Sequence, residues 1–261
     1  MKLVDNKNNT IQRRRLILQK LTEEEEIYVS ELSNFFEVSE VTIRNDLLHL
    51  EEKNLLLRVR GGAIKLELNS ELDKQYSERT KINFQQKSQI GKSAAKLIDS
   101  NNTIIIGSGT TTAELARNIS NDDQLTIITN SIPALHSLLT KPNLEVIVLG
   151  GRIRKNSGSL AGPLAERMLE NFYVDKVFLG ADGCDLQRGM YISDMECSHL
   201  MQLMISNAKQ VILLADSSKF RQKSLALVCP CDKIDIIVTD EAIAQEDKRW
   251  FEEHGISVII A

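Results

Sequence analysis

The fold is decided by the stretch TIIIGSGTTT, residues 103–112, which joins an aliphatic run to glycines and hydroxyl-bearing residues. An uninterrupted aliphatic run is typical of a strand that is buried on both faces of a sheet. Leu115 and Ile119 follow at the spacing of an amphipathic helix, so residues 107–112 are expected to form a strand-to-helix turn. Glycines let the backbone approach an anion, and the first turn of a helix offers unpaired N–H groups. The stretch therefore predicts an α/β fold with an anion-binding turn.

Short aliphatic runs alternate with helical stretches up to the end of the chain, which is typical of a mostly parallel sheet with helices on its faces. Strands are expected at residues 103–106, 125–129, 145–149, 176–179, 210–215, 235–238 and 257–260. The carboxyl ends of parallel strands share one edge of the sheet, where ligands bind. We therefore expect a binding site at that edge, formed by Ser108, Gly109, Thr110, Thr111, Asn130, Gly151, Arg152, Asp182, Gly183 and Lys219.

The residue types at this edge favour a phosphorylated sugar as the ligand. The turn at residues 108–111 and the ammonium of Lys219 both favour a dianion, and Arg152 adds positive charge. Asp182 is better suited to accept hydrogen bonds from sugar hydroxyls. A glycine-rich turn alone is weak evidence, so the hypothesis depends on several strands ending together in polar or glycine residues.

The N-terminal part of the chain predicts three short helices. A first helix fits residues 13–21, and apolar residues between positions 29 and 36 recur every three to four residues, as on the buried stripe of a second helix. Ser39 is a favourable N-cap for a third helix. Helices of this kind enter the DNA major groove, where Arg pairs with guanine, Asn with adenine, and Val or Thr contacts a thymine methyl. The candidate base-reading residues are Val41, Thr42, Arg44 and Asn45.

A β-hairpin is expected between residues 57 and 66, where apolar and basic residues alternate around Gly61-Gly62. Its basic side chains would contact the phosphate backbone of DNA, and the run Arg13-Arg14-Arg15 is expected to add a second backbone contact. Together these elements predict a winged helix-turn-helix over residues 11–66. Its expected DNA contacts are Ser39, Val41, Thr42, Arg44, Asn45, Arg58, Arg60 and Lys65.

Composition bounds the remaining possibilities. The 261 residues carry a net charge of −4 and are 42% hydrophobic, which fits a globular protein and argues against a wholly basic nucleic-acid coat. Residues 67–83 are polar and are expected to connect the first domain to a ligand-binding domain at residues 84–261. The cysteines show no zinc spacing, and no apolar run approaches the roughly 20 residues that cross a bilayer. We expect no metal, no cofactor, no membrane partner and a cytoplasmic location.

Two nucleotide-binding motifs can be rejected. The tripeptide Gly91-Lys92-Ser93 matches the end of a Walker A loop, but Gln86 stands where the first glycine belongs and no strand precedes it. The turn at Gly107 lacks the GxGxxG spacing of a dinucleotide-binding fingerprint.

The chain resembles the DeoR family of bacterial regulators from about residue 11 to residue 260. The resemblance is carried by VSEVTIRNDL (38–47), RGGA (60–63), GTTT (109–112) and DSSKF (216–220). It implies repression of a carbohydrate-use operon at duplex operator DNA and relief by a phosphorylated sugar, and within the family the chain looks closest to repressors of the N-acetylgalactosamine and galactosamine type. A dimer or tetramer is expected, because two DNA-binding domains would match the two half-sites of an operator.

The second domain is also similar to ribose-5-phosphate isomerase, through the Gly180-Ala181-Asp182 turn and the ADSSK stretch at 215–219. This similarity supplies the alternative of a sugar-phosphate isomerase. Leu179 stands where the enzyme has an Asp, and residues 192–199 lack the Lys and glycines of the enzyme. Because the acid/base set is missing, we expect a regulator and no enzyme activity. A further alternative is a DNA-binding protein with a vestigial pocket.

Overall fold

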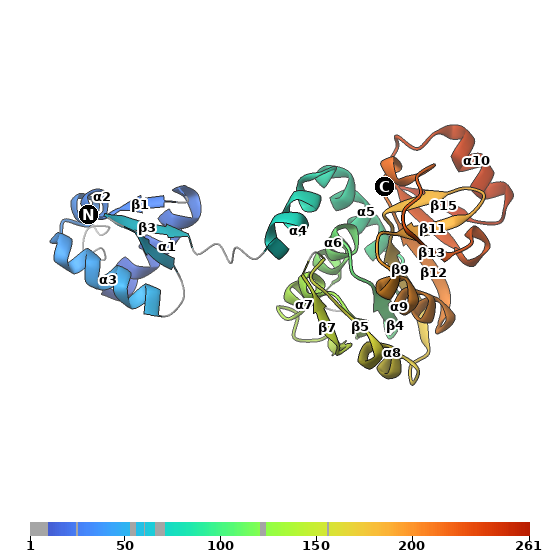
Figure 1. Cartoon of the computed structure of the whole chain (residues 1–261), viewed down its shortest axis with the longest axis horizontal. Helices are drawn as coiled ribbons and strands as arrows, with labels where there is room; N and C mark the ends of the chain where they lie inside the picture. Colours follow the sequence, from blue (N-terminus) through green and yellow to red (C-terminus); the bar gives the residue numbers. More distant parts are fainter. Residues whose placement is uncertain are drawn as a thin grey trace. The chain divides into compact units, whose positions relative to one another are not determined.

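The computed structural model of the chain describes residues 10–24, 26–52, 56–59, 61–65, 71–120, 124–155 and 157–261. They belong to two compact units, Met1–Asn69 and Ser70–Ala261 (Figure 1). No helix among these residues has the length and apolar character to cross a bilayer.

The first unit is a winged helix-turn-helix, as predicted. Its core consists of apolar side chains from all three helices and the sheet, among them the fully buried Ile17, Phe36 and Ile43. Glu37 ends the second helix in the left-handed region (φ 56°), which turns the chain sharply before the third helix. The elements are α1 (Thr10–Glu24), β1 (Glu26–Tyr28), α2 (Val29–Phe36), α3 (Glu40–Glu52), β2 (Leu56–Val59) and β3 (Gly62–Lys65), and the antiparallel sheet has the order β1-β3-β2.

A buried ion pair ties α1 to α3. Arg13 Nε lies 2.5 Å from Asp46 Oδ2, and Arg14 Nε lies 2.7 Å from Asp46 Oδ1. Arg13 is only 4% exposed, so the expectation that it contacts the DNA backbone is wrong. The physical reason is that the Asp46 carboxylate, itself 2% exposed, would be an uncompensated buried charge without a cationic partner.

The second unit is built on a seven-stranded, fully parallel sheet, as the alternating pattern predicts. Its strand order is β15-β14-β12-β9-β4-β5-β6. Every strand expected from the sequence is present, with ends that differ by at most two residues. The strands are β4 (Thr103–Ile106), β5 (Thr126–Thr129), β6 (Glu145–Val148), β9 (Val174–Gly180), β12 (Ala208–Leu214), β14 (Ile236–Thr239) and β15 (Ser257–Ile260).

Helices cover both faces of this sheet. Ile104 and Ile106 face a core shared with α5, α6 and α7, whereas Ile105 faces a core shared with α8, α9 and α10. This alternation explains why the strand is apolar at every position. Residues 71–81, within the stretch assigned to the connector, form the helix α4 of the second unit. The helices are α4 (Glu71–Lys81), α5 (Phe84–Ala95), α6 (Thr110–Asn118), α7 (Ile132–Leu138), α8 (Pro163–Leu169), α9 (Met195–Ser206) and α10 (Gln245–Glu253), with short 3-10 turns η1 (Ser217–Lys219) and η2 (Cys231–Lys233).

Two small antiparallel additions were not expected from the sequence. They are the three-stranded sheet β10-β11-β13 and the hairpin β7-β8. Gly189 begins β11 with φ 122°, and a Cβ atom there would lie 1.9 Å from the carbonyl oxygen of Cys229. A glycine is therefore required where β11 passes β13. The strands are β7 (Arg152–Arg154), β8 (Ser159–Ala161), β10 (Gly183–Asp185), β11 (Gly189–Ile192) and β13 (Ala226–Cys229).

Candidate functional site

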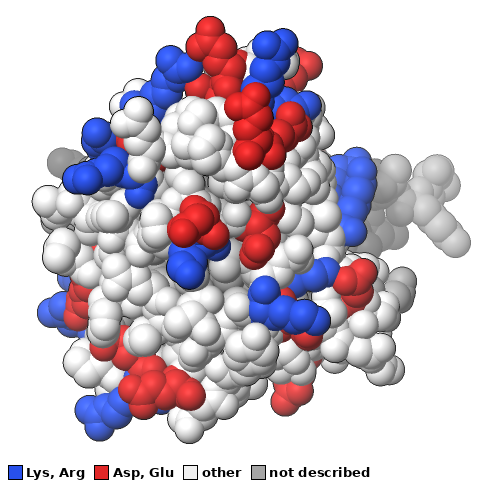
Figure 2. Space-filling view, turned by 90° about the vertical axis from the view of Figure 1, so that its right-hand side faces the viewer, with Lys and Arg blue, Asp and Glu red and all other residues white. Residues whose placement is uncertain are grey.

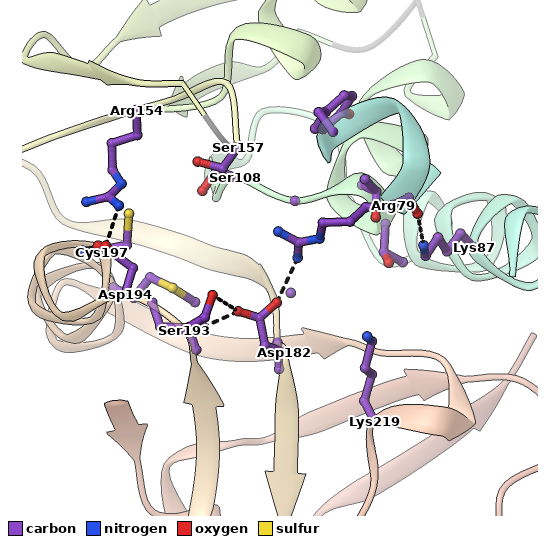
Figure 3. A pocket seen from close by; sticks show the side chains of 18 of the residues that line it. Arg79, Lys87, Ser108, Arg154, Ser157, Asp182, Ser193, Asp194, Cys197 and Lys219 are labelled. Carbon is purple, nitrogen blue, oxygen red and sulfur yellow. Dashed lines mark hydrogen bonds and ion pairs between the residues drawn. The ribbon is translucent and has the colours of Figure 1, made fainter. Parts of the chain in front are cut away.

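A cavity of about 390 Å³ opens where β4 and β9 end (Figure 3). Its walls come from the turn after β4, the end of β9, the segment that joins β11 to α9, the β7-β8 hairpin, η1, and the helices α4 and α5. The residues that line it are Tyr76, Arg79, Ile82, Lys87, Ser108, Gly109, Thr110, Thr111, Arg154, Ser157, Gly180, Ala181, Asp182, Ile192, Ser193, Asp194, Cys197, Met201 and Lys219.

Six of the ten residues expected from the sequence line this cavity: Ser108, Gly109, Thr110, Thr111, Asp182 and Lys219. The other four do not. Asn130 is 2% exposed and donates to the carbonyl of Leu160, and its own Oδ1 has no hydrogen-bond partner among the described residues. Arg152 is 74% exposed and pairs with Glu196. Gly151 and Gly183 instead allow close backbone contacts, with Ala161 and Gln222 respectively.

The turn after β4 has the geometry of an anion site. Gly109 precedes α6, and Thr112 Oγ1 donates to the carbonyl of Gly107 at 2.7 Å, which fixes the turn. Thr110 and Thr111 are each 7% exposed and line the cavity. The first N–H groups of a helix have no acceptor within the helix and carry its positive dipole end. This end of the cavity is therefore suited to an anion.

Lys219 is held at the cavity by a capped turn. Asp216 Oδ1 accepts hydrogen bonds from the Ser218 hydroxyl at 2.5 Å and from the Ser218 N–H at 3.3 Å. Asn83 Nδ2 donates to the same oxygen at 2.9 Å. Because Asp216 is 1% exposed, these contacts fix the backbone that carries Lys219.

Asp182 accepts three hydrogen bonds in this structure. Its Oδ2 accepts from the Ser193 N–H at 2.8 Å and the Ser193 hydroxyl at 2.7 Å. Its Oδ1 accepts from Arg79 Nη2 at 2.7 Å, across the cavity from α4 (Figure 3). Because Oδ1 accepts a single hydrogen bond, a ligand hydroxyl can donate to it either beside Arg79 or in place of Arg79.

Three cations at the cavity were missed by the sequence analysis: Arg79, Lys87 and Arg154. Lys87 is 5% exposed, and its Nζ donates to the carbonyls of Arg79 at 2.5 Å and Ile82 at 2.6 Å. Burial lowers the pKa of the Lys87 ammonium, and the Asp216 carboxylate opposes that shift. No periodicity marks Arg79 or Lys87, because they lie in or next to the polar stretch interpreted as a connector. Arg154 stands two residues after Arg152, on an unexpected strand.

A cluster of ion pairs lies at the end of the cavity next to α9. Arg154 pairs with Asp194 and also with Glu196, whose Oε2 lies 3.2 Å from Arg154 Nη1. Asp194 caps α9 by accepting from the Cys197 N–H at 2.8 Å. Burial raises the pKa of the Cys197 thiol to about 11, so the thiol is neutral at pH 7.

The charge of the cavity lining is positive. Among the described lining residues there are four cations, from Arg79, Lys87, Arg154 and Lys219, and two carboxylates, from Asp182 and Asp194. An excess of two positive charges, in addition to a helix N-terminus, suits a dianion. In the part of the chain that the structure describes, no group of His, Cys, Asp or Glu could hold a metal ion.

The exposed face of α3 carries the expected base-reading residues. Val41 is 62% exposed, and Arg44 and Asn45 are also exposed. Ser39 accepts from the Thr42 N–H at 3.2 Å and so caps the helix. Arg44 pairs with Glu40 at 2.5 Å within α3, so it must exchange that partner to reach a base.

The wing is only partly described. The Arg58 N–H donates to Glu51 Oε1 at 3.0 Å, and the Arg58 guanidinium lies 3.8 Å from Glu51 Oε2. Arg60 and the side chain of Lys65 lie outside the described residues.

Figure 2 shows a face of the second unit. Basic side chains are scattered over it and several lie beside acidic ones, so this face of the second unit carries no continuous basic surface of the kind that binds a DNA backbone.

Comparisons with known proteins match both units. The family model described as the DeoR-like helix-turn-helix domain matches residues 13–68, and the DeoR C terminal sensor domain matches residues 82–241. The putative aga operon transcriptional repressor of Escherichia coli O157:H7 is 33% identical over 96% of this chain and 94% of its own length. The transcriptional repressor GlcR of Bacillus subtilis is 33% identical over 94% of this chain and 93% of its own length.

Solved structures overlap this chain only in part. Ribose 5-phosphate isomerase A from Methanocaldococcus jannaschii covers 53% of this chain and 55% of its own at 21% identity, with a TM-score of 0.40. An overlap of this extent has no bearing on function. The two relatives above, which cover 96% and 94% of this chain, are named as transcriptional repressors, which supports a regulator over the isomerase alternative.

Proposed function

This chain belongs to the DeoR family of transcription regulators, and on that premise we propose that it represses a carbohydrate-use operon and is controlled by a phosphorylated sugar. The observation that carries the proposal is a single cavity in which a helix N-terminus and an excess of cations lie beside a carboxylate. The same chain carries a winged helix-turn-helix with an exposed recognition face.

The phosphate is assigned to the turn at residues 108–111 and to Lys219. Both the N–H groups at the start of α6 and the ammonium favour a dianion, and both line the cavity. The sugar hydroxyls are assigned to Asp182, whose carboxylate accepts but cannot donate when ionised. A free sugar would lack the charge that the cations select.

Operator duplex DNA is assigned to α3 and the wing. Val41, Thr42, Arg44 and Asn45 occupy the first turns of α3, from which a recognition helix contacts base edges. Ser39, Arg58, Arg60 and Lys65 are the further proposed contacts, and the basic ones would hold the phosphate backbone.

The finer parts of the proposal concern ligand, assembly and boundaries. The relative named for the aga operon supports an amino-sugar phosphate as the effector. A homo-oligomer, dimer or tetramer, would present two DNA-binding domains to paired operator half-sites. We propose a cytoplasmic location for it. As domain bounds we propose residues 11–66 for the DNA-binding domain and 84–261 for the effector-binding domain, joined by residues 67–83, of which α4 belongs to the second compact unit.

A thermal-shift screen of the full chain tests the effector. A ligand that binds only the folded protein raises its unfolding temperature in a concentration-dependent way. We expect a phosphorylated hexose or amino sugar to raise that temperature and its unphosphorylated counterpart to leave it unchanged. If no phosphorylated sugar shifts the transition, or if the free sugar shifts it equally, the assignment of the cavity is wrong.

A further inference from the structure

Arg79 reaches across the cavity from α4, the first described element of the second unit. Its Nη2 lies 2.7 Å from Asp182 Oδ1, and Figure 3 shows the guanidinium extending from α4 toward that carboxylate. The Arg79 side chain is 45% exposed, so it can change its partner without disturbing a packed core.

The backbone around Arg79 is anchored independently of its guanidinium. Lys87 Nζ donates to the carbonyls of Arg79 and Ile82, and Asn83 Nδ2 donates to Asp216. These contacts hold the last turn of α4 against the cavity whether or not Arg79 pairs with Asp182. The guanidinium can therefore change its partner while the backbone that carries it stays in place.

We propose that Arg79, in addition to Lys219, binds the phosphate in this cavity, and that its guanidinium leaves Asp182 to do so. The proposal rests on the proposed function, because it assumes a phosphate at the turn of residues 108–111. The planar guanidinium can donate two parallel hydrogen bonds to two oxygens of a phosphate, which an ammonium cannot do, and the dianion offers it more charge than one carboxylate.

The exchange also defines the class of effector. When Arg79 leaves, Asp182 keeps the two donors of Ser193 and regains a free oxygen for a ligand hydroxyl. A molecule with both an anionic group and hydroxyls satisfies both former partners, whereas inorganic phosphate satisfies only Arg79. In the sequence, α4 directly follows the DNA-binding unit. Ligand binding would therefore change a contact of the first helix after that unit.

The test is a double-mutant cycle with inorganic phosphate as the probe, measured by calorimetry on the full chain in chloride-matched solutions. Asp182→Asn removes the competitor of the phosphate, so we expect it to tighten phosphate binding about two- to fivefold, the range of a partly exposed ion pair. Arg79→Gln should weaken phosphate binding, and Arg79→Lys should restore part of it. In the Arg79→Gln background, Asp182→Asn should have no effect.

The outcomes are distinct. If Asp182→Asn tightens binding equally with and without Arg79, it acts only by removing negative charge, and the exchange is refuted. Arg188→Gln removes one positive charge, as Arg79→Gln does, but at an exposed site outside the cavity, so it controls for the effect of net charge on Arg79→Gln. Phosphate binding that is lost in Lys219→Ala but indifferent to Arg79→Gln overturns this inference alone. Absence of phosphate binding to the parental protein overturns both this inference and the phosphate site.

Discussion

Replacing Lys219 with alanine should separate ligand binding from DNA binding. Lys219 lies in η1 at the cavity, and the Asp216 caps that fix this turn use the backbone and Ser218, so the turn should persist without the ammonium. A hydrogen bond to a charged group contributes about 1.5 to 3 kcal/mol, which corresponds to about 10- to 150-fold weaker binding of a sugar phosphate. Three other cations remain in the lining, so the loss should fall toward the lower end of that range.

Calorimetry with the sugar phosphate that raises the unfolding temperature most would measure the change. The matched control is Lys223→Ala, since Lys223 is 61% exposed, pairs with Asp185 at 3.5 Å and does not line the cavity. Operator affinity in the absence of effector should be unchanged in both variants. Parental affinity of Lys219→Ala for the sugar phosphate would refute the placement of the phosphate.

Three further outcomes are expected. Arg44→Ala and Asn45→Ala should each weaken the free energy of operator binding by about 1 to 3 kcal/mol, through the loss of a contact with one base pair. Arg58→Ala should weaken binding to all DNA sequences and flatten its salt dependence, and titrations at several salt concentrations can check this. Burial raises the pKa of Cys197 from 9.0 to about 11, so the contribution of this thiol to stability is present below pH 9 and is lost as the pH rises through 11. Because Cys229 also has a pKa raised to about 12, the denaturant series is compared with Cys197→Ala, which should show a smaller decline over that interval; equal declines would mean that the Cys197 thiol ionises normally. Gly189→Ala should destabilise the second unit by about 3 kcal/mol, because strained backbone and the contact with the Cys229 carbonyl combine, and an unchanged unfolding temperature would contradict the close approach of β11 to β13.

The central sheet could be predicted because its strands are buried on both faces. Ile104, Ile105 and Ile106 face alternate cores, so the sequence is apolar at each position and contrasts with the polar turns on either side. The carboxyl-end rule then placed Ser108, Asp182 and Lys219 at one edge, and the structure brings these three to one cavity.

The missed elements are short and depend on tertiary contacts. The strands β7, β8 and β10 have three residues each, too few for an alternation to be recognised. Arg79 and Lys87 lie outside the strand ends to which the edge rule applies, and only the folding of α4 against the cavity reveals them. Arg13 shows the opposite error, because a basic run near a DNA-reading helix also supplies the partner of a buried Asp46.

The central claim is that occupancy of the cavity controls DNA binding by the same chain. The direct measurement is the operator affinity of the full chain, by fluorescence anisotropy, with and without a saturating sugar phosphate identified by thermal shift. We expect the affinity to change about 5- to 150-fold, which corresponds to a coupling of about 1 to 3 kcal/mol. We expect Lys219→Ala to bind the operator normally and to need about tenfold or more sugar phosphate to show half of that change. An operator affinity that stays constant while calorimetry shows the cavity to be saturated would contradict the claim.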